Sequence, residues 1–94
     1  NNANIYKDRG DIYSNIGKNK EAIEDYSRAI QINPNYAEAY LARGMANDDD
    51  LKQSIEDCET ALRLNLDKRL IESTMGFLEA RKNKLLAKNQ LEQN

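Results

Sequence analysis

The sequence predicts an all-α fold of antiparallel helical hairpins, closed by a long C-terminal capping helix. Apolar residues recur at the three- and four-residue spacing of amphipathic helices along most of the 94 residues. One proline, four glycines and no β-branched runs leave few breaks, which favours helix over strand. An 11-residue segment also occurs twice, as expected of stacked helical units.

The first two helices are marked by apolar stripes. The first stripe stops near Gly17 and consists of Ile5, Tyr6, Ile12, Tyr13 and Ile16. The second consists of Ala22, Ile23, Tyr26, Ala29 and Ile30. It ends at Asn33 because the residue before a proline, here Pro34, is disfavoured in a helix.

Capping signals mark the later helices. Asn35 precedes Glu38 by three residues, the spacing of a capping box, and predicts the start of a third helix. Asp50 and Gln53 repeat that spacing and predict the start of a fourth helix. We therefore interpret the acidic turn at residues 48–50 as a helix cap and not as a cation site. Asp67 is the expected cap of a fifth helix that runs to about residue 91.

Internal repetition is the strongest signal in the chain. Residues 23–33 return as residues 55–65, with the Ile-Glu-Asp triplet, one alanine and one asparagine unchanged. Three further residues recur 34 positions later, so that Tyr6, Arg9 and Gly10 correspond to Tyr40, Arg43 and Gly44. A period of this length is typical of helical repeat proteins.

Composition excludes several classes of function. The chain has 14 basic and 16 acidic residues, no histidine and a formal net charge of −2. This balance argues against nucleic acid as a partner, and no apolar run is long enough for a membrane span or signal segment. Without histidine, a histidine-activated nucleophile or an imidazole zinc site cannot be built. We therefore expect no enzyme, no metal, no cofactor and no membrane partner.

Two features of the chain bear on its setting. Its single cysteine, Cys58, cannot form an internal disulfide, which fits a reducing, cytoplasmic compartment. The chain begins with Asn and not with Met, so we expect it to be a piece of a longer protein.

One unit of the chain resembles the tetratricopeptide repeat (TPR), whose pattern is W-x2-L-G-x2-Y, then A-x3-F, then P. The residues at these positions are Tyr6, Arg9, Gly10, Tyr13, Ala22, Tyr26 and Pro34, with aromatic residues exchanged and Arg9 in place of leucine. This repeat spans about residues 3–36, and a degraded one, two residues short, spans about 37–68. With a last helix over about 69–92, the resemblance implies one TPR-like α–α superhelical domain over residues 1–94.

Arginine replaces the leucine of the TPR pattern in both repeats. Arg9 and Arg43 take equivalent places, and each is followed by a carboxylate in the second helix of its repeat, Asp25 or Asp57. We expect the two arginines either to extend their charged ends to solvent or to pair with these carboxylates.

The resemblance implies a scaffold that binds a partner peptide or helix in a concave groove lined by the first helix of each repeat. In the first helix the groove positions fall on Asn4, Lys7, Asp11, Ser14 and Asn15. In the third helix they fall on Glu38, Leu41, Met45 and, at the edge, Asp48. The fifth helix would form the far wall.

Some TPR proteins hold a C-terminal carboxylate with five cationic or amide side chains. Only Lys7 matches that set, because the other positions carry Asp11, Ala42, Leu70 and Thr74. Acidic groove residues would repel a carboxylate, so we predict a polar or basic partner segment instead.

An alternative interpretation is a self-assembly module. Apolar residues of the last helix extend past what two repeats can cover, namely Leu78, Leu85, Leu86 and Leu91. The short turn before Leu51 could also let a hairpin swap between chains. In this interpretation the chain is a homodimer or a higher homo-oligomer.

Overall fold

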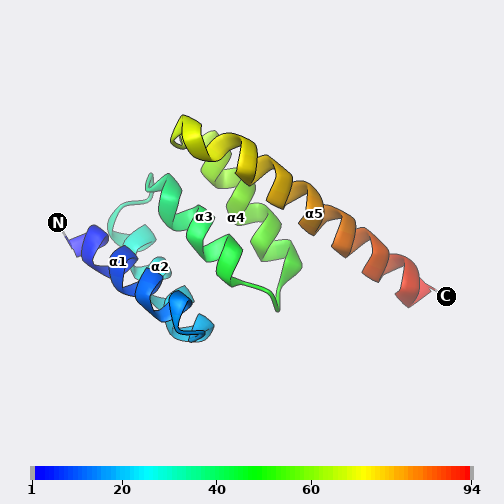
Figure 1. Cartoon of the computed structure of the whole chain (residues 1–94), viewed down its shortest axis with the longest axis horizontal. Helices are drawn as coiled ribbons and strands as arrows, with labels where there is room; N and C mark the ends of the chain where they lie inside the picture. Colours follow the sequence, from blue (N-terminus) through cyan, green and yellow to red (C-terminus); the bar gives the residue numbers. More distant parts are fainter. Residues whose placement is uncertain (1, 94) are drawn as a thin grey trace.

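The computed structural model describes residues 2–93, which form five helices and no strand. They are α1 (Asn2–Asn15), α2 (Asn19–Ile32), α3 (Ala37–Ala46), α4 (Leu51–Arg63) and α5 (Lys68–Gln93). Figure 1 shows the helix axes running roughly side by side, with α5 extending beyond the others. The predicted all-α fold of helical hairpins with a long C-terminal helix is confirmed.

Side-chain hydrogen bonds set the starts of α4 and α5. The Asp50 carboxylate accepts the N–H of Gln53 at 3.1 Å, so the predicted cap of α4 is confirmed. The Asp67 carboxylate accepts the N–H of Arg69 at 2.9 Å and its guanidinium at 2.8 Å. These bonds lower the pKa of Asp67 to about 2, the side-chain bond to Arg69 being the larger cause.

The start of α3 differs from the prediction. The helix begins at Ala37 with Tyr36 as its cap residue and no side-chain cap, so the predicted capping role of Asn35 is wrong. The reason is a competing turn: the Asn33 side-chain oxygen accepts the N–H of Asn35 at 3.2 Å. This bond holds Asn35 in the link before the helix, as asparagine often does beside a proline.

Each hairpin closes around a glycine. In the first hairpin, formed by α1 and α2, a Cβ at Gly10 would lie 2.7 Å from Cε1 of the buried Tyr26 ring. In the second hairpin, formed by α3 and α4, a Cβ at Gly44 would lie 2.9 Å from the carbonyl oxygen of Ser54. The Ser54 hydroxyl donates to the Gly44 carbonyl at 2.6 Å. The paired helices therefore approach closely because neither glycine has a side chain.

The shorter second hairpin loses one turn of its first helix. The helix α3 has 10 residues where α1 has 14. The link after it, residues 47–50, is closed by the Asn47 side chain, which accepts the N–H of Asp50 at 3.2 Å.

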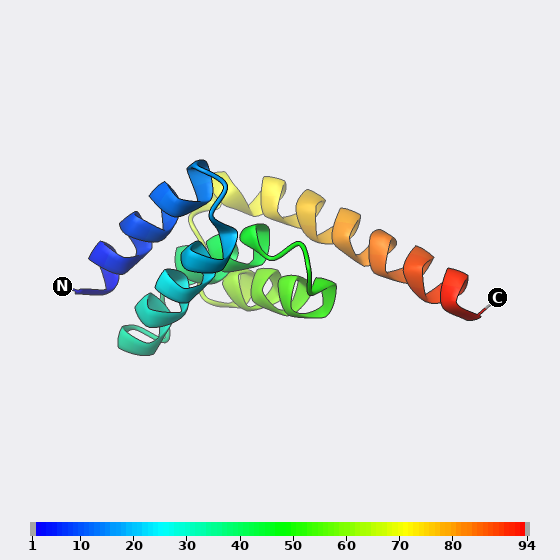
Figure 2. The ribbon, with the colours of Figure 1, turned by 90° about the horizontal axis from the view of Figure 1, so that it is seen from below.

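The second helix of each hairpin packs on the first helix of the next unit, α2 on α3 and α4 on α5. Ala29 of α2 shares a buried cluster with Ala39 of α3, and Cys58 of α4 shares another with Leu78 of α5. Figure 2 shows the result: α1 and α5 stand on the same side with α3 between them, and α2 and α4 lie beneath. The helices α1, α3 and α5 therefore border one face of the molecule, which we call the groove face.

Candidate partner-binding groove

The structure places the eight predicted groove residues on α1 and α3. On α1, Asn4 and Asn15 are exposed near the two ends of the helix, while Lys7, Asp11 and Ser14 between them are half-buried. On α3, Glu38 is half-buried, Leu41 is buried and Met45 is exposed. These residues form two separate regions. Leu41 and Met45 line an apolar hollow between α3 and α5, whereas the polar residues lie on α1 and at the start of α3.

The apolar hollow lies between α3 and α5 and has a volume of about 140 Å³. Two of the predicted groove residues, Leu41 and Met45, form its α3 wall. The α5 wall consists of Leu70, Ser73, Thr74 and Phe77. The hollow therefore joins side chains that lie about 30 residues apart in the sequence.

Two residues of the α5 wall, Leu70 and Thr74, were named only as positions of the carboxylate-binding set. The other two, Ser73 and Phe77, were not predicted, although the sequence carried a signal for them. Gly76 follows Gly44 by 32 residues, and the same offset takes Leu41 to Ser73 and Met45 to Phe77. Projecting the repeat onto the last helix would have found them.

Two buried polar groups beside the hollow are incompletely bonded. Thr74, a lining residue, is 2% exposed, and its hydroxyl oxygen has no hydrogen-bond partner among residues 2–93. Arg81 lies four residues beyond Phe77 on α5, with its guanidinium 4.7 Å from the centroid of that ring. One guanidinium nitrogen donates to Asp48, whereas Nη1 is buried without a partner among the described residues. The edge position Asp48 is therefore engaged by Arg81.

The α1 side of the groove is held by a chain of polar contacts. The Lys7 ammonium donates to the Asp11 carboxylate at 2.9 Å, and the Tyr26 hydroxyl donates to the other oxygen of Asp11 at 2.7 Å. Burial, followed by the bond to Asp11, raises the pKa of Tyr26 above its ordinary value. Lys7, the one residue that matches the carboxylate-binding set, is thus paired within the chain.

The region where α1 meets the start of α3 is acidic. Tyr36 lies in the field of Asp8, Asp11 and Glu38, opposed by the single positive charge of Lys7. Burial raises the pKa of Tyr36, and the three carboxylates raise it further. Three carboxylates against one ammonium favour a cationic ligand here.

The expected arginine–aspartate pairs are confirmed. Arg9 donates to both carboxylate oxygens of Asp25, at 2.7 and 2.8 Å, and lowers the pKa of that buried carboxyl. Arg43 binds Asp57 in the same bidentate way, at 2.8 Å each. Arg43 also donates to the Ser27 hydroxyl at 3.2 Å, which links the second hairpin to α2 of the first. These pairs position the groove helices and do not lie among the lining residues of the hollow.

The leucines proposed for self-association differ in exposure. Leu78 is buried in the cluster that joins α4 to α5, so it is unavailable for contact between copies. Leu85 is half-buried, whereas Leu86 and Leu91 are exposed. The candidate self-association surface therefore includes only residues in the last third of α5.

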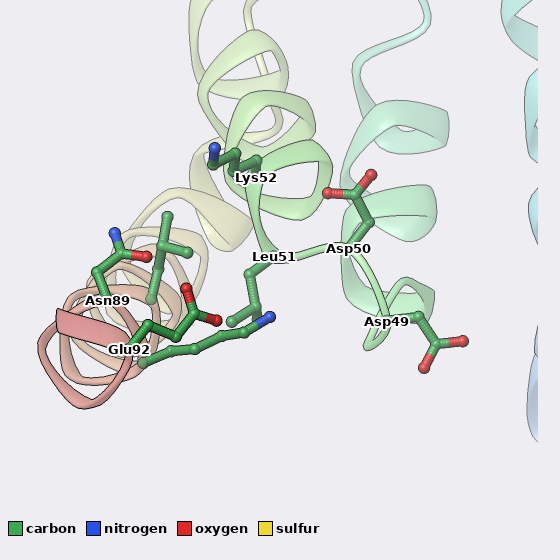
Figure 3. A pocket seen from close by; sticks show the side chains of 8 residues that line it. Asp49, Asp50, Leu51, Lys52, Asn89 and Glu92 are labelled. Atoms are coloured by element: carbon green, nitrogen blue, oxygen red, sulfur yellow. The ribbon is translucent and has the colours of Figure 1, made fainter. Parts of the chain in front are cut away.

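A second hollow of about 200 Å³ lies between the start of α4 and the end of α5. Figure 3 shows its side chains of mixed charge, among them Asp49, Asp50, Leu51, Lys52, Asn89 and Glu92. Within residues 2–93, no group of three or more Asp, Glu, Cys or His side chains is placed to hold a metal. This hollow is open and polar and lacks the apolar walls of the one beside α3.

Two stacked helical hairpins with a groove face on their first helices define an α-helical repeat protein. Residues 10–47 match the family model described as "TPR repeat". This segment of the chain is a tetratricopeptide repeat, a unit that generally mediates protein–protein interaction.

The chain is also similar to a protein of Pyropia yezoensis named "Uncharacterized protein ycf37". The two are 35% identical over 83 residues, which cover 86% of this chain and 47% of that protein. The chain thus spans about half the length of this relative. In the part of the chain that the structure describes, no helix combines the length and apolarity needed to cross a bilayer.

Proposed function

We propose that the chain binds a peptide or helix of a partner protein on its groove face. The observation that carries the proposal is the hollow between α3 and α5, where Leu41 and Met45 face Leu70 and Phe77. An apolar hollow that is open on one side offers a partner surface to bury, and burial of a few central side chains supplies most of the free energy of a protein interface. The remaining predicted residues, five on α1 and Glu38 on α3, would contact the partner through polar groups.

The proposal includes no catalytic step and no cofactor, nucleic-acid or membrane partner. The cytoplasmic setting expected from the single cysteine stays a prediction.

A peptide selection tests the proposal. A random peptide library would be selected against the full chain, and the affinities of enriched peptides measured by fluorescence anisotropy. We expect Glu38→Lys and Met45→Glu to weaken binding by about tenfold or more, the effect of losing one central contact. The matched control is Glu24→Lys, the same charge reversal at an exposed position of α2, away from the groove face. Equal losses for the control and the groove variants would contradict the proposal.

A second candidate function is self-assembly through the end of α5. The exposed Leu86 and Leu91 favour it, since both lie past Arg81, the last buried residue of α5. Light scattering after size exclusion, over a hundredfold range of concentration, would give the mass. A dimer that the double variant Leu86→Lys/Leu91→Lys converts to a monomer would support this function. A monomer at all concentrations would exclude it.

A further inference from the structure

We propose that the hollow between α3 and α5 is the anchor subsite for one side chain of leucine, methionine or phenylalanine size, carried by a basic segment of a partner protein. The inference rests on the proposed groove function and names the chemistry of its partner. Three observations carry it: the size of the hollow, its unbonded hydroxyl and the charges beside it.

The size of the hollow fits a single apolar side chain. Its volume is about 140 Å³, and an apolar cavity of roughly 150 Å³ in another protein admits a benzene ring. Its walls are mainly apolar: Leu41 and Met45 on α3, Leu70 and Phe77 on α5. An incoming leucine or phenylalanine would exchange water for contact with both walls, which is the arrangement of an interface anchor.

The hydroxyl of Thr74 gives a second reason to expect an occupant. Thr74 lines the hollow and is 2% exposed, yet its Oγ1 has no hydrogen-bond partner among residues 2–93. A buried polar atom without a partner is unfavourable, and native proteins contain few of them. Because Oγ1 itself has almost no exposed surface, a polar backbone atom of the partner would complete this hydrogen bond once the Thr74 side chain rotates toward the hollow.

The charges near the hollow select a basic segment. Glu38 precedes Leu41 on α3 by three residues, a rise of about 4.5 Å along the helix. Among residues 2–93, Glu38 has no ion-pair partner, whereas Lys7 is paired with Asp11 and Asp48 with Arg81. A lysine or arginine next to the anchor would therefore meet the free carboxylate of Glu38.

The two methionines of the chain provide a direct test. Met45 lines the hollow, while Met75 lies on α5 outside it, and the two are similarly exposed, at 52% and 57%. The full chain would be labelled with ¹³C at its methionine methyls and titrated with a blocked nonapeptide whose central leucine is flanked by two lysines on each side. We expect the Met45 methyl resonance to shift and saturate, and the Met75 resonance to stay in place.

Matched peptides and variants separate the contributions. Serine in place of the central leucine, or glutamates in place of the lysines, should each weaken binding by about tenfold or more. The neutral variant Met45→Gln should weaken binding to the same degree, and Met75→Gln by less than about twofold. Thr74→Val keeps the shape of the side chain and removes the hydroxyl, so unchanged affinity would overturn the hydrogen bond to Thr74.

The outcomes distinguish this inference from the groove proposal. If selected peptides lose affinity to Glu38→Lys but leave the Met45 methyl unshifted, the groove function stands and the anchor subsite is overturned. If neither the Glu38 nor the Met45 variant affects any peptide, both are overturned. A Met45 resonance that moves with protein concentration alone would show that a second copy fills the hollow, and would overturn the peptide as its occupant.

Discussion

Glycine has opposite roles at two positions of this chain, and the difference lies in what surrounds each Cα. At Gly10 an added Cβ would meet the Tyr26 ring at 2.7 Å, and that ring cannot move aside easily because it is buried and bonded through its hydroxyl to Asp11. At Gly76, in the middle of α5, an added Cβ would meet nothing within 4 Å. The first glycine permits a helix crossing, while the second only weakens its helix.

We therefore predict opposite effects of the same substitution. Gly10→Ala should lower the free energy of unfolding by about 1–3 kcal/mol, because the methyl group overpacks the crossing of α1 and α2. Gly76→Ala should raise it by about 1 kcal/mol, because alanine has the higher helix propensity and its methyl group enters open space. Urea unfolding followed by circular dichroism measures both, and each variant is the control for the other. An equal gain in stability for both would contradict the close approach at Gly10.

At the scale of elements, the internal repeat shows which helix faces are covered. Ala39 and Ala46 of α3 correspond to Ile5 and Ile12 of α1, 34 residues earlier. The alanines are buried against α2, whereas the isoleucines are 64% and 60% exposed. The same register position is therefore an internal contact in the second hairpin and open surface in the first.

This difference predicts how the equivalent positions tolerate lysine. Ala39→Lys should lower the free energy of unfolding by about 3 kcal/mol or more, because it forces a long cation between α2 and α3. Ile5→Lys should change it by less than about 0.5 kcal/mol, as is usual for an exposed position. Thermal or urea unfolding of both variants at one low protein concentration provides the comparison. A large loss for Ile5→Lys would mean that the α1 face is covered in solution.

The sequence predicted the helices well because their signals are local. Stripe periodicity, the Asp50 cap and the proline at residue 34 act within a few residues of each helix end, and the structure confirms the helices that they predict. The start of α3 was mispredicted because two local signals compete there, and the Asn33 turn prevails over a cap at Asn35. Signals read from a few neighbouring residues do not show which of two such competing hydrogen bonds will form.

The groove was only partly predictable because it depends on distant parts of the chain. The resemblance to the TPR pattern predicted Leu41 and Met45 as groove residues. The α5 wall of the hollow, in contrast, forms only when α5 packs beside α3. Leu78 was expected on an outer surface, and packing of α5 on α4 buries it instead. Where two helices meet, the sequence gives the apolar stripe of each helix, but which part of the stripe stays open depends on the packing.

At the scale of the whole molecule, extent and burial are unevenly distributed. The chain measures 49 × 28 × 20 Å, and the buried residues of α5 end at Arg81. Stability therefore rests on the two hairpins and the first half of α5, where the titratable Tyr26 and Cys58 are buried. Because these two side chains ionise less readily when buried, the free energy of unfolding of the chain depends on pH.

We predict that the chain loses stability at alkaline pH, starting near pH 9. Burial raises the pKa of Cys58 from 9.0 to about 11, and it raises that of Tyr26 above 10.0. Between these limits the unfolded chain releases protons that the folded chain retains, so the free energy of unfolding should fall by about 1.4 kcal/mol per pH unit for each group. Below pH 9 both groups are protonated in both states, and their contribution is complete. Urea unfolding from pH 7 to 11 measures the profile.

The variant Cys58→Ala is the control. It should be less stable at every pH because it leaves a small cavity, and its stability should begin to decline about one pH unit later, near pH 10, where the unfolded tyrosine begins to ionise. Lysine titration is common to both proteins, so parallel profiles would contradict the role of the buried thiol.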